Sequence, residues 1–432
     1  MLSRRKFIGI AGGVGAAGAA GAAGGTAVWS TLLRDHVDEA VQQRDSPTDT
    51  THPDAATAAE GTANRVLVVV QLSGGNDGLN TLIPSDPRYR DARSALAIPE
   101  AELVAINAAG YSLHPSLAPL AALWNDGLIT ALEGVGLEDQ SRSHFKAMDS
   151  WWSATPGAAS QTGWLGRWLD ATEKGRQPNP LRAVALGGGS PALIGVSSLP
   201  TVVQSPAQFS MRTPRGCDAK TLTDAFLATA QPLVTGNDVF AAAQQSFPDT
   251  VEAIEVLQKV RAQASGQSVT ARNGAQGATA LLQSAAGIIE QNIGTQVIVV
   301  AVNGFDTHAD QLDRHGALLA DIGEGIAQFV THMQQAGRAD DVLLLTTSEF
   351  GRRVAENASD GTDHGNGNVA FVVGNRINGG KVVGDLGLGA LVDGDLPVSI
   401  DTRSLYSVAL DWMGGPTDLV LGGTFDRYGV LR

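Results

Sequence analysis

The chain has 432 residues, of which 52 are glycine and one is cysteine, and its formal net charge at pH 7 is -14. This length accommodates one large domain or two ordinary ones. The acidic balance argues against a nucleic-acid-binding protein, because no basic stripe is present to meet phosphates. The single cysteine, Cys217, excludes an intramolecular disulfide, and its polar surroundings do not favour a catalytic thiolate.

The first 34 residues resemble an export signal of the twin-arginine type. Arg4 and Arg5 are followed by Phe7, then by a mildly apolar run, and then by small residues around Ala20 that offer a cleavage site. Residues 1–34 are therefore expected to carry the folded protein through the twin-arginine translocase to the periplasm or the extracellular space. The sequence leaves open whether the segment is cleaved or stays as an anchor. The alternative is a basic N-terminus before a flexible tail.

Residues 35–64 are polar and acidic and lack apolar periodicity, so they are predicted to form a disordered linker. Residues 65–432 form the predicted mature domain. No segment of this domain has the length and apolarity of a transmembrane helix.

Four β-branched apolar runs predict strands that are buried on both faces, as in a parallel sheet. They cover residues 65–72, 297–302, 342–347 and 369–373. Apolar residues at spacings of three and four from Leu312 to Met333 predict a helix between the second and third runs, which completes a right-handed crossover. Helices are also predicted at 116–124 and 142–154. The fold class is therefore predicted as α/β, with a doubly wound, mostly parallel sheet, helices on both faces and a helical insertion at about 205–290.

Polar residues collect where the predicted strands end, and ligands of open α/β sheets bind beyond these ends. Asp77 follows the first run, where it either faces a cleft or forms part of a turn. Asp306 and His308 follow the second run, and their oxygen and nitrogen atoms suit Zn, Mn or Fe. The alternative for this pair is a helix cap made by Asp306 or Thr307.

Two further clusters flank the third and fourth runs. Glu349 and Arg352 follow the third run. Glu349 is a candidate metal ligand, and Arg352 either binds an oxyanion or pairs with Glu349. Asp363 and His364 precede the fourth run in a glycine-rich loop, where they could complete a metal set with the Asp306 segment.

The segment Arg142-Ser143-His144 begins a predicted helix. Ser141 or Ser143 either caps this helix or acts as a nucleophile that the helix dipole activates. His144 is a candidate ligand, base or orienting group, and Arg142 a candidate anion-binding group.

Several motifs together resemble those of the DUF1501 family of exported bacterial proteins, over about residues 65–385. They are QLSGGNDGLN, RSHFKAMDSWW, GWLGRWLD, FDTHADQ, SEFGRR and TDHGNG. The family resembles in fold the alkaline phosphatase and sulfatase superfamily, whose enzymes hold two metals at strand ends. The resemblance implies that Asp77 is the first-strand carboxylate, a metal ligand, and that Ser143 is the nucleophile. It also implies that Asp306 and His308 form a metal pair and that His364 is the late histidine.

The sequence departs from the superfamily pattern at two places. Glu349 stands where an Asp-His pair is usual, and Phe350 replaces the expected histidine. The spacing of Asp306 and His308 is also tighter than usual. These departures leave open whether the site holds two metals, one or none.

The function implied by the resemblance is an exported, metal-dependent hydrolase of phosphate or sulfate esters that uses Zn, Mn, Fe or Ca. Ser143 would attack, and Arg142 or Arg352 would stabilise the developing charge. The alternative is a non-catalytic exported binding or scaffold protein on the same fold. Four tryptophans would then either form a sugar-stacking surface or pack in the core, namely Trp151, Trp152, Trp164 and Trp168.

Overall fold

The computed structural model describes residues 64–157, 160–173, 179–204, 215–228, 248–260 and 277–432. The predicted signal segment, nearly all of the predicted linker and parts of the predicted insertion lie outside these residues. Among the helices in the described part of the chain, none is both long and apolar enough to cross a membrane.

A nine-stranded sheet forms the centre of the domain, in the order β11-β5-β10-β9-β1-β8-β6-β7, with β12 paired to β5. The bounds are β1 Val66–Ser73, β5 Ile129–Gly136, β6 Ala183–Leu186, β7 Thr201–Val203, β8 Val297–Asn303, β9 Val342–Thr347, β10 Asn368–Val373, β11 Lys381–Gly384 and β12 Ile400–Asp401. Within this sheet β10 is antiparallel to β9 and β5, and the remaining pairings are parallel. The four predicted strands are β1, β8, β9 and β10.

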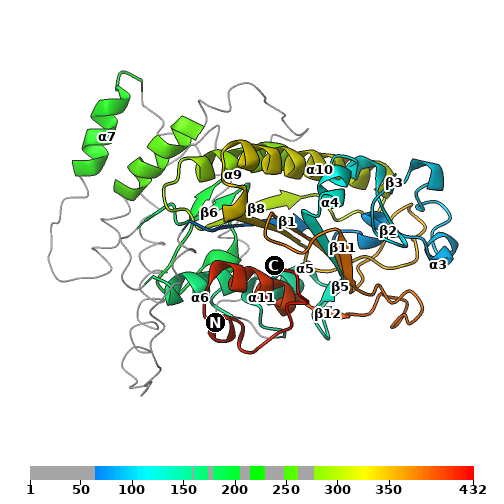
Figure 1. Cartoon of the computed structure of the whole chain (residues 1–432). Helices are drawn as coiled ribbons and strands as arrows, with labels where there is room; N and C mark the ends of the chain where they lie inside the picture. The colour runs from blue at the N-terminus through cyan, green and yellow to red at the C-terminus, as the bar shows by residue number, and fades with distance from the viewer. Residues whose placement is uncertain (1–63, 158–159, 174–178, 205–214, 229–247, 261–276) are drawn as a thin grey trace, which may run out of the picture. The chain divides into compact units, whose positions relative to one another are not determined.

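Helices cover both faces of the sheet (Figure 1) because β1 is apolar on both sides. Val66, Val68 and Val70 point into one core, and Leu67 and Val69 into the other. The first core is covered by α4 Leu120–Asn125, α9 Ala278–Glu290 and α10 Gln311–Gln335. The second is covered by α5 His144–Ser153, α6 Trp164–Ala171, α11 Thr402–Met413 and α12 Thr417–Leu421. The predicted α/β class, with a mostly parallel sheet between helices, is confirmed.

The remaining elements are short. A second sheet contains β2 Leu82–Pro84, β4 Tyr111–Leu113 and β3 Val104–Ala105. The other helices are α3 Pro87–Asp91, α7 Ala219–Ala228, η1 Gly78–Asn80, η2 Glu100–Glu102, η3 Pro115–Leu117, η4 Pro191–Leu193 and η6 Ala339–Asp341.

The predicted helices map closely onto observed ones. The predicted helix between the second and third runs is α10, the one at 142–154 is α5, and the one at 116–124 is divided between η3 and α4. Within the predicted insertion, α7 and residues 248–260 are helical. The last helix of that stretch, α9, packs against α10 and β8 and so belongs to the layer that covers the sheet.

The tryptophans pack in the second core. Trp151, Trp164 and Trp168 are buried, and Trp164 stacks on Tyr406 with ring centroids 4.2 Å apart. Trp152 is half-buried and donates a hydrogen bond of 2.9 Å to Gln71 Oε1. The alternative of a sugar-stacking surface is therefore wrong for the three buried rings.

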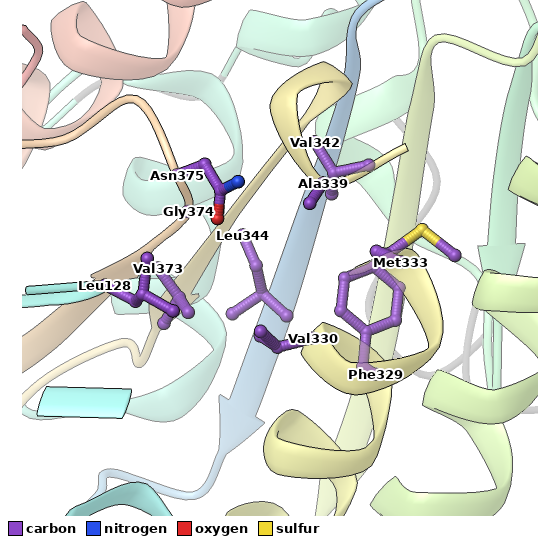
Figure 2. A pocket seen from close by; sticks show the side chains of 10 residues that line it. All are labelled: Leu128, Phe329, Val330, Met333, Ala339, Val342, Leu344, Val373, Gly374 and Asn375. Carbon is purple, nitrogen blue, oxygen red and sulfur yellow. The ribbon is translucent and has the colours of Figure 1, made fainter. Parts of the chain in front are cut away.

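One small pocket lies between α10 and the strands β9 and β10 (Figure 2). Its volume is about 20 Å³, and its lining includes Phe329, Val330 and Leu344. This space holds at most one water molecule, and no titratable side chain lines it. The pocket is therefore a packing defect in the first core.

A candidate metal centre at the strand ends

The strand directions bring five chain segments to one edge of the sheet. The carboxyl ends of β1, β5, β8 and β9 meet there, and the amino end of β10 joins them because β10 runs the other way. Gly74, directly after β1, has a φ of +124°, and a Cβ at this position would lie 2.2 Å from the backbone nitrogen of Asp306. Glycine at 74 therefore permits the ends of β1 and β8 to approach each other closely.

Three imidazoles surround the carboxylate of Asp306. Its Oδ1 lies 3.1 Å from His308 Nε2 and 3.2 Å from His364 Nε2, and its Oδ2 lies 3.5 Å from His144 Nε2. The ligand atoms of His144, Asp306 and His364 all lie within 4.8 Å of one another. We call His144, Asp306, His308 and His364 the histidine–aspartate cluster. The structure thus brings together residues from three of the predicted groups.

Each imidazole of the cluster directs its Nδ1 at an oxygen atom. The acceptors are Glu349 Oε1 for His144 at 2.9 Å, Asp363 Oδ1 for His308 at 3.3 Å and the carbonyl oxygen of Arg142 for His364 at 2.8 Å. Carbonyl and carboxylate oxygens only accept, so each Nδ1 carries the proton. In the neutral ring the lone pair is then on Nε2, which faces the carboxylate of Asp306.

The arrangement of these nitrogen atoms suits a bound cation. His308 Nε2 and His364 Nε2 approach to 2.8 Å, where two lone pairs repel unless a proton or a metal lies between them. His144 Nε2 is buried and makes no hydrogen bond among the described residues. Three Nε2 atoms and one carboxylate are the donor set of a zinc-type site, in which a carboxylate or carbonyl commonly holds the other ring nitrogen.

The charge states of the cluster suit a metal ion. Burial raises the pKa of Asp306, but the hydrogen bond and the charge of Arg352 outweigh it, and the pKa falls to about 2. Burial lowers the pKa of His364 below its ordinary value, and its contacts with the Arg142 carbonyl and with Asp306 only partly oppose this. Near neutral pH the carboxylate is therefore ionised and this imidazole is neutral, which are the forms that bind metals.

Arg352 has a different role from the predicted one. It was expected to bind an oxyanion of the substrate, but it is 1% exposed. Its guanidinium donates to Asp306 Oδ1 at 2.7 Å and to the backbone carbonyls of Gly74, Gly75, Phe305 and Thr362. Arg352 therefore positions Asp306 and fastens the strand-end loops together. The predicted pairing with Glu349 does not occur.

Glu349 and Asp363 orient two histidines of the cluster and are not themselves part of the cluster. Glu349 is 2% exposed, and its Oε1 accepts from the backbone of Gly74 at 2.7 Å as well as facing His144. Asp363 is exposed and faces His308 Nδ1, and the side-chain amide of Asn357 lies 3.3 Å away from it. Both had been predicted as metal ligands, but each carboxylate instead faces the Nδ1 atom of a histidine of the cluster.

The structure does not bring Asp77 to the cluster. Asp77 is 1% exposed and forms an ion pair with Arg93 at 2.6 and 3.0 Å, and Gln311 donates to it at 2.5 Å. Burial raises the pKa of Asp77, but the ion pair with Arg93 outweighs it, so the pKa lies below its ordinary value. The predicted role as a metal ligand is corrected here, because the cation at this carboxylate is a guanidinium.

Ser143 and Arg142 lie on the loop that enters α5. Ser143 is the N-cap residue of α5 and is exposed, but its side chain makes no capping hydrogen bond. Ser141 Oγ instead accepts from the backbone nitrogen of Ser143 at 3.2 Å. The hydroxyl of Ser143 is therefore available next to His144, whereas Arg142 forms an ion pair with the buried Asp395.

Sequence reasoning missed the residues that support the cluster, namely Gln140, Asn357 and Asp395, and also the two partners of Asp77, Arg93 and Gln311. Gln140, for example, donates to the backbone oxygen of Glu349 and accepts from Trp151 Nε1 at 3.3 Å. Only Gln140 had a local signal, since it stands beside the predicted helix start. The others act through contacts that no spacing along the chain indicates.

A family model described as "Protein of unknown function (DUF1501)" matches residues 97–402. No curated protein matches the sequence. The solved structures that resemble the chain include a lipoteichoic acid synthase, LtaP, from Listeria monocytogenes, with 10% identity, a TM-score of 0.39, and coverage of 91% of this chain and 82% of that one.

They also include a protein in the alkaline phosphatase superfamily from Vibrio parahaemolyticus, with 10% identity, a TM-score of 0.41, and coverage of 83% and 69%. A third is the C-terminal periplasmic domain of EcEptC from Escherichia coli in complex with Zn, with 11% identity, a TM-score of 0.39, and coverage of 83% and 85%.

Proposed function

The chain belongs to the DUF1501 family of proteins of unknown function, and from the histidine–aspartate cluster we propose that it is a metal-dependent hydrolase of phosphate or sulfate esters. The observation that supports this most strongly is the convergence of three Nε2 atoms on Asp306, with each Nδ1 facing an oxygen. Such a set repels itself without a cation.

The proposed centre holds one divalent metal. His144, Asp306 and His364 would bind it, with His308 as a further ligand, and the nitrogen-rich set favours Zn, Mn or Fe over Ca. A second metal has no place at Asp77, because Arg93 already matches the charge of that carboxylate. The single-metal alternative is thereby preferred over the two-metal one.

The metal, when bound, would polarise the ester and lower the pKa of a nearby hydroxyl. Ser143 would supply that hydroxyl, since it is exposed, uncapped and at the positive end of α5. Its Oγ would form the bond to phosphorus or sulfur and give up its proton, and the ester oxygen would leave as the alcohol after taking up that proton through water. One water molecule would then hydrolyse the ester on Ser143, which restores the hydroxyl and releases phosphate or sulfate. Glu349 and Arg352 would keep His144 and Asp306 in position.

The test combines metal analysis with turnover. We expect the purified chain to bind one equivalent of Zn, Mn or Fe and to hydrolyse aryl phosphates or aryl sulfates. His364→Ala should lose the metal and the turnover, whereas Ser143→Ala should lose turnover and keep the metal. His332→Ala is the matched control, because His332 is on the exposed side of α10 and pairs only with Glu290 among the described residues.

Three outcomes would contradict the proposal. The proposed metal centre would be refuted by a folded protein that takes up no metal. It would also be refuted by a His364→Ala variant with the metal content of the wild type. A protein that binds the metal but turns over neither ester class would instead support the exported scaffold.

The site of action is proposed to be outside the cytoplasm. The Ser-Arg-Arg-x-Phe pattern at residues 3–7 supports recognition by the twin-arginine translocase. Replacing Arg4 and Arg5 by lysine should retain the protein in the cytoplasm, which cell fractionation would show. Equal export of the lysine variant and the wild type would count against this route.

A further inference from the structure

Two arginines beside the cluster share one buried carboxylate. Asp395, whose side chain is 0% exposed, accepts from Arg142 through Oδ2 and from Arg353 Nε through Oδ1, the latter at 3.1 Å. The side chains of Arg142 and Arg353 are 43% and 37% exposed. The buried acid therefore holds two guanidinium side chains that are partly exposed to solvent. We call these three residues the arginine pair and its anchor.

The backbone of each arginine is bonded to the cluster or its support. The carbonyl oxygen of Arg142 accepts from His364 Nδ1 at 2.8 Å, and Ser143 is the next residue. The backbone nitrogen of Arg353 donates to the carbonyl oxygen of Asp363 at 2.9 Å. The pair therefore lies at the rim of the proposed metal centre and next to the proposed nucleophile.

The arginine pair shares one ion-pair partner among the described residues, the carboxylate of Asp395. Arg353 also donates to the backbone carbonyl of Asp393 at 2.8 Å, and the carboxylate of Asp363 faces His308 and Asn357. In a chain of net charge -14, two partly exposed guanidiniums held beside a polar centre favour an anionic ligand.

We propose that Arg142 and Arg353 bind a second anionic group of the substrate, so that the preferred ester carries a further phosphate, sulfate or carboxylate close to the bond that is cleaved. Guanidinium groups recognise such oxyanions through paired N–H donors, and a shared buried acid keeps the two groups in a fixed relative position. This inference rests on the proposed hydrolase function. It adds the substrate class, which is an ester with at least two anionic groups.

The test compares two matched substrates, an aryl phosphate and the same aryl phosphate with a carboxylate on the ring. We expect the wild type to prefer the carboxylated substrate in kcat/KM. Arg353→Ala should reduce that preference about tenfold or more, as expected for the loss of a charge-assisted hydrogen bond. Arg376→Ala is the matched control, because Arg376 is an exposed arginine paired with Asp340 away from the strand-end loops.

A bracing role of Arg353 would give a different result. It would lower the thermal midpoint and slow both substrates equally, so an unchanged preference overturns the proposal. Binding of inorganic pyrophosphate to the chelated, metal-free chain, measured by calorimetry, separates this inference from the hydrolase itself. Pyrophosphate binding that weakens in Arg353→Ala supports the arginine pair even if no ester is hydrolysed. Equal binding by the variant and the wild type refutes it.

Discussion

Glu349 shows how one buried acid determines what a neighbouring ring can do. Its Oε1 accepts from the backbone of Gly74 and faces Nδ1 of His144, which leaves Nε2 of that ring free for a metal. We expect Glu349→Gln to keep the fold but to weaken metal binding by about 10- to 100-fold, as for other groups that orient a ligand. Competition titration against a chromophoric chelator measures this. Glu324→Gln, on the exposed side of α10, should bind the metal like the wild type.

The ion pair of Asp77 and Arg93 makes a prediction about stability. Both side chains are almost completely buried, at 1% and 0% exposure, so removing one partner strands a charge in the core. We expect Arg93→Leu to lower the free energy of unfolding by about 3–5 kcal/mol in urea titrations. Arg88→Ala removes an exposed pair with Asp86 and should cost about 1 kcal/mol or less. Equal effects of the two variants would contradict this account.

The sequence could not predict which carboxylate pairs with a metal and which with an arginine, and the reason is physical. The strand-end rule located Asp306, His308 and His364, because each stands next to an apolar run that ends at the same edge. The partners of Asp77, in contrast, lie 16 residues away at Arg93 and 234 residues away at Gln311. Only the packed structure decides these pairings, and so Asp77 was expected at the metal.

At the scale of the elements, the close approach of the segments that follow β1 and β8 depends on a glycine. An alanine at position 74 would have an unfavourable positive φ and would also place its Cβ 2.2 Å from the backbone of Asp306. We expect Gly74→Ala either to fold without binding the metal or to fail to fold. Gly337→Ala has a φ of +66° but meets nothing within 4 Å, so it should cost only about 1 kcal/mol and keep the metal. Metal content and thermal midpoints of both variants give the answer.

The strand β5 carries a buried acid that makes stability depend on pH. Glu133 is fully buried, its Oε2 accepts from Tyr111 at 2.7 Å, and its Oε1 has no partner among the described residues. Burial raises the pKa of Glu133 from 4.5 to about 7. Because the folded pKa lies above the unfolded one, the stabilising contribution is present below pH 4.5 and is lost as the pH rises towards 7.

We therefore expect the wild type to lose about 2 to 3 kcal/mol relative to Glu133→Gln between pH 5 and pH 8. Urea unfolding of both proteins at the two pH values isolates this term, since the other titrating groups are shared. Parallel curves for the two proteins would show that the acid is already ionised in the fold.

The elements that the sequence revealed are the strongly periodic ones. Runs of β-branched residues identified β1, β8, β9 and β10, and spacings of three and four identified α10. The strand β5 was missed because Glu133 and two glycines interrupt its apolar run, and β6 and β7 because they are short. The periodicity of apolar residues does not reveal that β10 is antiparallel to its neighbours. This direction places the amino end of β10, and with it the preceding His364, at the edge of the sheet where the cluster lies.

At the scale of the whole molecule, the proposed metal should stabilise the fold. A ligand that binds only the folded state adds about 4 kcal/mol when it is present at 1,000 times its dissociation constant. We expect a strong chelator to lower the thermal midpoint of the wild type by several degrees and to leave His364→Ala unchanged. Differential scanning calorimetry with and without the chelator measures both. An equal thermal midpoint of the wild type with and without the chelator would argue against a bound metal.

The distances along the chain between the cluster and its supports have a biological consequence. His144 contacts Glu349, 205 residues away in the sequence, and His364 contacts Asp306, 58 residues away. The cluster therefore does not form in a nascent or partly folded polypeptide. The proposed ion would therefore bind only where folding is completed. If the twin-arginine segment acts as we propose, that place is the cytoplasm, and the cell's tightly buffered internal metal pool, not the medium outside, selects the ion that this protein carries out.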